Sequence, residues 1–159
     1  MATKIRSATL AVSVSEDITI NGKREGGVST QIISGINEIS RRILTITTAE
    51  ATIATFSSAV ASAGHYIAAD VRYIRFTNQD GTNFITLTFR NQDNDEVAIK
   101  LDSGQTFVLN ADNSGGMVDI FNATQDADAA SDTALGDLTN IQADANTGSC
   151  DLEMFIASV

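Results

Sequence analysis

The chain has 159 residues, of which 43% are hydrophobic, and its mean hydropathy is +0.02. This length suits one domain with its own core, and the composition excludes a fully disordered chain. No apolar run approaches the roughly 18 residues of a membrane-spanning helix, and residues 1–10 lack the apolar block and cleavage site of a signal peptide. We therefore expect a soluble protein with no membrane partner.

Charge is distributed unevenly along the chain. All ten Lys and Arg lie in residues 1–100, where ten Asp and Glu balance them, whereas residues 101–159 carry ten acids and no base. An anionic surface repels nucleic acid, so we expect no direct nucleic-acid binding. The charge-balanced part is better suited to docking against another protein.

Strand signals begin near the N-terminus. Apolar residues alternate from Ala8 to Val14, and Asn21-Gly22 is a dipeptide typical of type I′ turns. Residues 28–48 continue as two extended runs rich in Ile and Thr, with a break expected near Ser34-Gly35. Residues 1–48 are therefore predicted to form a meander that docks on a partner.

Residues 47–64 fit two structures. Several apolar residues recur at helical spacing, and Thr47 with Glu50 matches a capping box, whereas residues 51–56 alternate as in a strand. Because the flanking sequence is strongly β, we predict a strand over Thr52–Phe56 and one helical turn around Ala59–Ala63.

A β-hairpin closed by Asp80 and Gly81 is predicted over residues 72–89. Paired positions then sum to 161, which sets Phe76 against Ile85, Ile74 against Leu87 and Arg72 against Phe89. One face of this hairpin is apolar and the other is polar. Residues Asn91–Asp95 then link it to the next pair of strands.

A second hairpin is predicted around the loop Asp102, Ser103 and Gly104. This loop length sets Ile99 against Phe107 and Val97 against Leu109, and Gly104 occupies the position where a bulge needs a positive φ.

The remaining sequence completes an all-β pattern. Residues 110–137 are rich in Gly, Asn, Asp and Ala and predict an acidic surface excursion around a short strand, Met117–Phe121. Residues 138–145 and 150–159 predict closing strands. Roughly ten short strands with turn signals between them indicate one domain over residues 1–159, an antiparallel, jelly-roll-like β-sandwich.

Few residues offer chemistry. The single Cys150 has no basic neighbour and is predicted to be a structural strand residue, and the single His65 is predicted to lie at the rim; a Cys/His pair across the fold is the alternative. The acids at 93–96 and 126–132 lack the order of a calcium-binding loop and are predicted to be solvated.

Enzymatic and sugar-binding motifs are also missing from the sequence. It contains no nucleophile elbow, no phosphate-binding glycine loop and no Trp for a sugar platform. We therefore expect no enzyme activity, no catalytic residue, no metal and no cofactor.

Four arginines are candidates for a partner interface: Arg41, Arg42, Arg75 and Arg90. Arginine forms planar, bidentate contacts, so these side chains could pair with carboxylates of a neighbouring subunit. Ordinary solvated charges are the alternative.

Several stretches resemble a family of small structural proteins from the virions of tailed bacteriophages, especially marine ones. The most specific are R-Y-I-R-x-T-N-x-D-x-T-N-F at Arg72–Phe84 and K-L-D-x-G-x-x-F at Lys100–Phe107. The segments SATLAVSVSEDITINGKREGG, ISGINEISRRILTI and GDLTNI also contribute. The similarity covers most of the chain and carries no catalytic residues with it.

The resemblance implies a capsid decoration or cement protein that binds the major capsid protein and neighbouring copies of itself. It implies location on the capsid surface of the virion after assembly in the host cytoplasm. The N-terminal part would dock on the shell and the acidic C-terminal part would face solvent. The alternatives are a tail, tail-tip or fibre-associated protein and, in a different class, a glycan-binding module.

Overall fold

The computed structural model describes residues 6–59, 63–111, 115–118, 120 and 137–159. These residues form thirteen β-strands and contain no helix, as the alternating sequence predicts. Contacts divide the chain into two compact units, Met1–Glu38 with Val159, and Ile39–Ser158.

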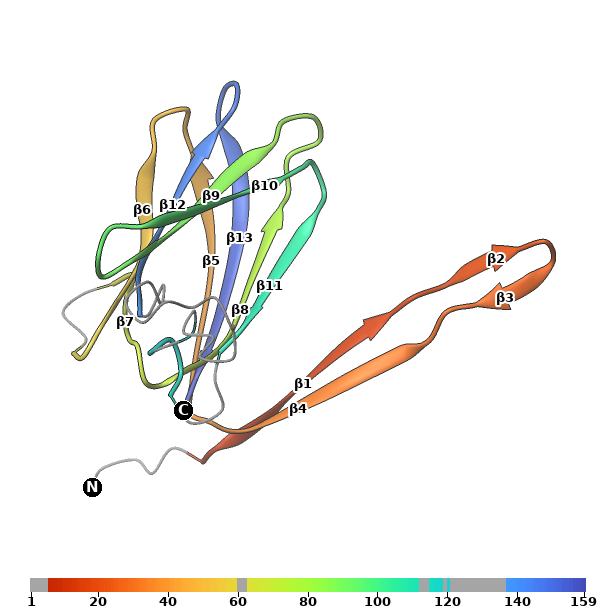
Figure 1. Ribbon diagram of the computed structural model, residues 1–159, viewed down its shortest axis with the longest axis horizontal. Coiled ribbons are helices and arrows are strands. Elements are labelled where there is room, and N and C mark those ends of the chain that lie inside the picture. The colour runs from red at the N-terminus through yellow and green to blue at the C-terminus, as the bar shows by residue number, and fades with distance from the viewer. Residues whose placement is uncertain (1–5, 60–62, 112–114, 119, 121–136) are drawn as a thin grey trace, which may run out of the picture. The chain divides into compact units, whose positions relative to one another are not determined.

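The first unit contains one long antiparallel ribbon (Figure 1). β1 (Ala8–Ser15) pairs with β4 (Val28–Ile36), and β2 (Ile18–Ile20) pairs with β3 (Lys23–Glu25) at the end of the ribbon. The expected type I′ turn is confirmed, because Asn21 and Gly22 have φ values of 52° and 76°. The predicted meander over residues 1–48 is therefore wrong in part: residues 8–36 form this single hairpin, whereas Glu38–Ile46 is a strand of the sandwich.

The two predicted runs are confirmed as separate strands, and the break between them lies at Asn37, two residues after the expected Ser34-Gly35. Gly35, with φ 84°, lies inside β4 beside a register shift at Ala8/Thr9, so it forms an irregularity in the strand and does not end it. β4 continues to Ile36 and β5 begins at Glu38.

The second unit contains a β-sandwich, so the predicted fold class is confirmed (Figure 1). Its sheets have the strand orders β10-β9-β12-β6-β7 and β11-β8-β13-β5. β9 pairs antiparallel with β10 and β12, β8 with β11 and β13, and β6 with β12, whereas β6 and β7 are parallel. The strands are β5 (Glu38–Ile46), β6 (Ala51–Ser57), β7 (His65–Ile67), β8 (Val71–Asn78), β9 (Ile85–Asn91), β10 (Glu96–Leu101), β11 (Thr106–Asn110), β12 (Leu138–Ala145) and β13 (Cys150–Ser158).

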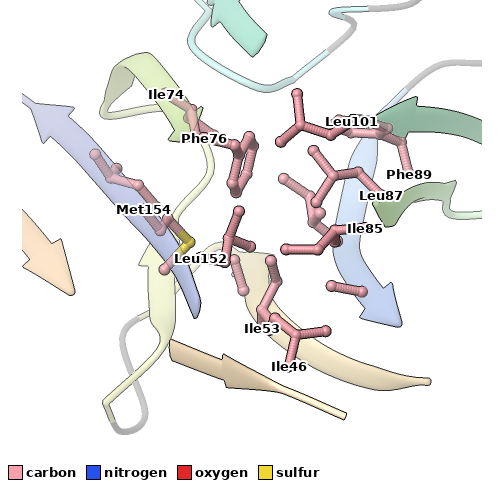
Figure 2. Packing of buried hydrophobic residues seen from close by; sticks show 14 of the residues in the cluster. Ile46, Ile53, Ile74, Phe76, Ile85, Leu87, Phe89, Leu101, Leu152 and Met154 are labelled. Carbon is pink, nitrogen blue, oxygen red and sulfur yellow. The ribbon is translucent and has the colours of Figure 1, made fainter. Parts of the chain in front are cut away.

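The core lies between the two sheets. Figure 2 shows Phe76 and Met154 from one sheet pointing toward Leu87 and Phe89 from the other. The rings of Phe76 and Phe89 meet edge to face, with centroids 6.4 Å apart, and Phe76 and Leu87 are fully buried. Side chains of alternating residues therefore supply the hydrophobic contact that holds the sheets together.

The predicted hairpin at Asp80-Gly81 is wrong. β8 pairs with β11 and β13, whereas β9 pairs with β10 and β12, so the two strands lie in opposite sheets. Neither Asp80 nor Gly81 has the positive φ that a type I′ turn requires. The apolar residues of β8 and β9 do face one another, but across the core and not along a ladder of backbone hydrogen bonds.

The crossing from β8 to β9 is built on Asn78 and Asp80. The buried amide of Asn78 donates to the carbonyls of Asn83 and Leu101 at 2.9 and 3.1 Å, and its Oδ1 accepts from the Asp80 N–H at 3.0 Å. The Asp80 carboxylate accepts from the N–H groups of Thr82 and Asn83 at 2.8 and 2.6 Å. These hydrogen bonds satisfy the backbone groups of a segment that leaves one sheet and enters the other.

The predicted second hairpin is wrong for the same reason. β10 lies in the five-stranded sheet and β11 in the four-stranded sheet, so Ile99 pairs with Leu87 and Phe107 pairs with Phe76. Gly104 does have the expected positive φ, 71°. The true hairpin joins β9 to β10 through residues 92–95, the segment predicted to be only a link.

Of the remaining predictions, one is confirmed, one is wrong and two lie mostly outside the described residues. The strand at Thr52–Phe56 is confirmed within β6. The strand predicted at Met117–Phe121 is wrong, because Met117 and Val118 lie in turns; Phe121 falls outside the described residues. The helical turn near Ala59–Ala63 and most of the acidic excursion at 110–137 also lie outside them.

Within the described part of the chain, no helix is long and apolar enough to cross a membrane.

The Asn78 crossing predicts a large effect for Asn78→Ala. This change removes the side-chain donor to the carbonyls of the half-buried Asn83 and the buried Leu101, so we expect a loss of roughly 2–4 kcal/mol in the free energy of unfolding. The control is Thr82→Ala in the same segment, which should change it by less than about 0.5 kcal/mol. Chemical denaturation measures both, and equal effects would contradict this role of Asn78.

The ribbon depends on a glycine at position 26. Gly26 has φ 120°, and a Cβ there would lie 2.3 Å from the backbone oxygen of Glu16, whereas a Cβ on Gly27 meets nothing within 4 Å. We expect Gly26→Ala to lower the hydrogen-exchange protection of the Glu16 amide, which donates to the Gly27 carbonyl at 2.9 Å. Gly27→Ala should have the smaller effect, and the reverse order would refute the assignment.

Candidate interaction site

A cluster of charged residues lies on the outer face of the four-stranded sheet. Arg41 in β5, Glu153 in β13 and Arg75 in β8 come from three neighbouring strands. Their neighbours Ile74 and Met154 are buried in the core, so the alternation of a strand directs the charged side chains outward. We call these three residues the Arg–Glu cluster.

Glu153 is the centre of the cluster. It is only 4% exposed, and its Oε2 lies 2.7 Å from a terminal nitrogen of Arg41, while its Oε1 accepts from Arg75. Gln79 donates a further hydrogen bond to Oε2 at 3.3 Å. The carboxylate is therefore neutralised and hydrogen-bonded, as a buried charge requires.

The side chains of the two arginines differ in how many contacts hold them and in how exposed they are. The guanidinium of Arg75 lies 5.9 Å from the ring centroid of Phe155 and donates to Thr77 Oγ1 at 2.7 Å. Its side chain is 30% exposed, whereas that of Arg41 is 66% exposed. Arg75 is thus held by the sheet, and Arg41 keeps donors that face solvent.

The electrostatics of the cluster favour an anionic partner. The hydrogen bonds from Arg41, followed by those from Arg75, hold the pKa of Glu153 below its ordinary value of 4.5. With Glu153 ionised, two guanidinium groups face one carboxylate, which leaves one positive charge in excess.

Exposed Ile39 and Ile43 flank Arg41 on the same face of β5. A planar cation between two apolar side chains can bind a carboxylate of another protein.

The other two predicted interface residues lie elsewhere. Arg90 in β9 pairs with Glu96 of β10 in the five-stranded sheet, so it does not join the Arg–Glu cluster. Arg42 points to the opposite side of β5 and lines a groove of about 520 Å³ with Gly64 and His65. The structure therefore brings together two of the four arginines, and three of the four have a carboxylate partner within the chain.

The acidic loop at 93–96 is organised by its own hydrogen bonds. Asn91 Oδ1 accepts from the N–H groups of Asp93 and Asp95 at 3.0 and 2.8 Å, and its amide donates to the Asp95 carboxylate at 3.1 Å. Across residues 6–59, 63–111, 115–118, 120 and 137–159, no group of three His, Cys, Asp or Glu is placed to hold a metal ion. The acids at 126–132 lie outside those residues.

Cys150 and His65 occupy different environments. Cys150 is buried, and burial raises the pKa of its thiol above the ordinary value of 9.0, which disfavours the reactive thiolate. His65 begins β7 and is half-buried at the groove with Arg42.

Sequence reasoning missed Glu153 and Asn78. Glu153 occupies an outward position in an alternating strand, which usually indicates a solvated side chain, and nothing local reveals that arginines from β5 and β8 enclose it. Asn78 follows an apolar run and precedes Asp80, which is equally typical of a turn. Only the pairing of β13 with β8 shows the role of Glu153.

The lowered pKa of Glu153 predicts a pH-dependent effect of Glu153→Gln. An ionised group with a depressed folded-state pKa stabilises the fold above its unfolded value and loses that contribution as pH falls through the folded value. We expect the variant to lose about 1–2 kcal/mol at pH 7 and less near pH 3, by chemical denaturation.

Glu96→Gln is the matched control, because Glu96 pairs with Arg90 at the surface and exposed pairs contribute about 0–1 kcal/mol. If Glu153→Gln were as mild as Glu96→Gln at pH 7, the cluster would not stabilise the sheet.

Comparison with known proteins adds no relative to this description. Neither the protein-family models nor the curated proteins searched include a match to this chain.

Proposed function

We propose that this chain is a non-enzymatic structural protein of a virus particle, most specifically a capsid decoration or cement protein that binds and stabilises the major capsid shell. The observation that carries the proposal is the ribbon of the first unit. Large apolar side chains are 52–71% exposed along it, namely Val14, Ile18, Ile20, Val28 and Ile32. They lie on both faces of the ribbon, since Val14 is opposite Ser29 and Val28 is opposite Ser15. Exposing these side chains to water costs free energy, and a partner that covers them removes that cost.

The resemblance in sequence supplies the kind of partner. It points to a capsid shell and to neighbouring copies of the same protein, and a symmetric shell offers many equivalent places for a modest contact. On this proposal the N-terminal residues dock on the shell, while the surface acids of residues 101–159 face solvent; the buried Glu153 is not one of them. The repeated contacts hold neighbouring shell subunits together without any covalent chemistry.

The Arg–Glu cluster supplies a second contact. Arg41 presents donors between two exposed isoleucines, and a carboxylate of an adjacent subunit is the group that fits them. This contact depends on charge, so it should weaken with salt, whereas contacts of the ribbon depend on apolar burial.

Binding to particles tests the proposal. We expect the full-length protein to co-sediment with shells that lack it, and Val28→Asp to weaken this binding at least about tenfold, because a charge on the ribbon must be desolvated. Val97→Asp is the control, since Val97 is an exposed apolar residue of the sandwich.

Cryo-electron microscopy of the particles gives the location. Density for this chain over the capsid lattice is the expected result. Density confined to the tail would overturn the capsid assignment in favour of a tail, tail-tip or fibre protein. Binding to glycans on an array, with none to particles, would favour a glycan-binding module.

A further inference from the structure

The outer edge of β1 is an unprotected strand edge. Within the described residues β1 pairs with β4 alone, so the backbone groups on its other side face no strand. No charged residue and no proline occurs from Ser7 to Ser15. Natural proteins usually protect such edges with charges, prolines or very short strands, because an open edge pairs with other chains.

The terminal strands of the sandwich sheets differ in this respect. β10 carries Glu96 and Lys100, and β5 carries Glu38, Arg41 and Arg42. β7 and β11 are only three and five residues long. β1 has eight residues without a charge, and the nine residues of its partner β4 also carry none.

The sequence of this edge is complementary to itself. If two copies of β1 run antiparallel with Ala11 opposite Ala11, paired positions sum to 22. Arg6 of each copy then faces Glu16 of the other. Within the strand, small residues face small residues and apolar residues face apolar ones: Ser7 with Ser15, Ala8 with Val14, Thr9 with Ser13, and Leu10 with Val12.

Other pairings match less well. Moving the register by two residues, to a sum of 24, sets Glu16 against Ala8 and leaves both charges without opposite partners. The edge of β4 contains Gly35 beside a register irregularity, which interrupts a ladder. In the described structure Arg6 and Glu16 form no ion pair with another residue, and both are exposed.

We propose that β1 is a self-association edge whose partner is β1 of a second copy of this chain, in an antiparallel two-fold pair centred on Ala11. The product is a four-stranded sheet in the order β4-β1-β1-β4, with ion pairs between Arg6 and Glu16 at both ends. A two-stranded ribbon is marginal alone, and four strands with an apolar stripe meet the minimum for a stable sheet. The role of this pairing rests on the proposed function, in which neighbouring copies of the chain contact one another.

Charge also favours this edge for contact between copies. The chain carries a net charge of −10, and all of that excess lies in residues 101–159. Two such chains repel one another through the surface that these residues form. The edge from Ser7 to Ser15 adds no charge, and its ends bring opposite charges together.

Site-directed disulfide formation tests the register. Directly opposed residues of antiparallel strands have Cα atoms about 4.5–5.5 Å apart, which a disulfide can bridge. We expect Ala11→Cys in the full-length protein to form a covalent dimer under mild oxidation, seen on a non-reducing gel. Thr9→Cys is the control, because two copies of residue 9 would lie about 13 Å apart. The native Cys150 is buried and should not contribute.

Charge exchange provides a second test with its own rescue. Arg6→Glu and Glu16→Arg should each raise the dimer dissociation constant about tenfold at low salt, as measured by analytical ultracentrifugation, because two like-charge pairs form per dimer. The double variant should restore association to near the wild-type level.

Two results would overturn the pairing: an Ala11→Cys protein that stays monomeric, or equal cross-linking of Thr9→Cys. Failure of rescue in the double variant would overturn the ion pairs and hence the register. Particle binding separates this failure from that of the proposed function. A protein that is monomeric and still binds shells refutes the pairing alone, whereas a dimer that binds no particle refutes the proposed function alone.

Discussion

The buried hydrogen bonds of Asn78 connect two of the places where the chain crosses from sheet to sheet, the one between β8 and β9 and the one between β10 and β11. Its amide binds the first crossing at Asn83 and reaches Leu101, where β10 ends and the second crossing begins. Its backbone N–H and carbonyl bond to Gln105 and Gly104 at 3.0 and 3.1 Å. One residue therefore helps to hold β8 beside β11 through its backbone and binds the segments next to β9 and β10 through its side chain. The packing of Phe76 against Phe89 follows from that arrangement.

The sequence predicts the strands and their inward faces well, but not their partners. Alternation in β8 and β9 assigns Ile74, Phe76, Ile85 and Leu87 to the core, and all four are fully buried. Alternation alone does not distinguish two strands that pair side by side from two strands that face each other across a core, because both arrangements bury the same residues. The difference lies in the connecting segment, where side-chain hydrogen bonds replace the type I′ geometry. Asn21-Gly22 shows the contrast, since positive φ at both residues gives a true two-residue turn there.

The candidate site was partly predictable for a related reason. Arginine in a β-rich sequence marks positions able to bind carboxylates, and Arg41 and Arg75 do so, but the carboxylate is Glu153, more than seventy residues away in sequence from both. Sheet order decides that proximity. The same order separates Arg90 and Arg42 from the cluster. This division of surfaces is consistent with the proposed assembly function: the ribbon exposes apolar side chains, Arg41 faces solvent beside Glu153, and a net charge of −10 limits unwanted association.

Nuclear Overhauser contacts between backbone protons test most directly whether the chain crosses between sheets after β8. We expect contacts across the pairs that β8 forms with β11 and β13, where Ile74 lies opposite Leu109 and Ile156. Side-chain contacts should connect Phe76 with Phe89 across the core. Backbone contacts joining Ile74 to Leu87 would instead show a hairpin at Asp80-Gly81 and would contradict the sandwich topology on which the surfaces depend.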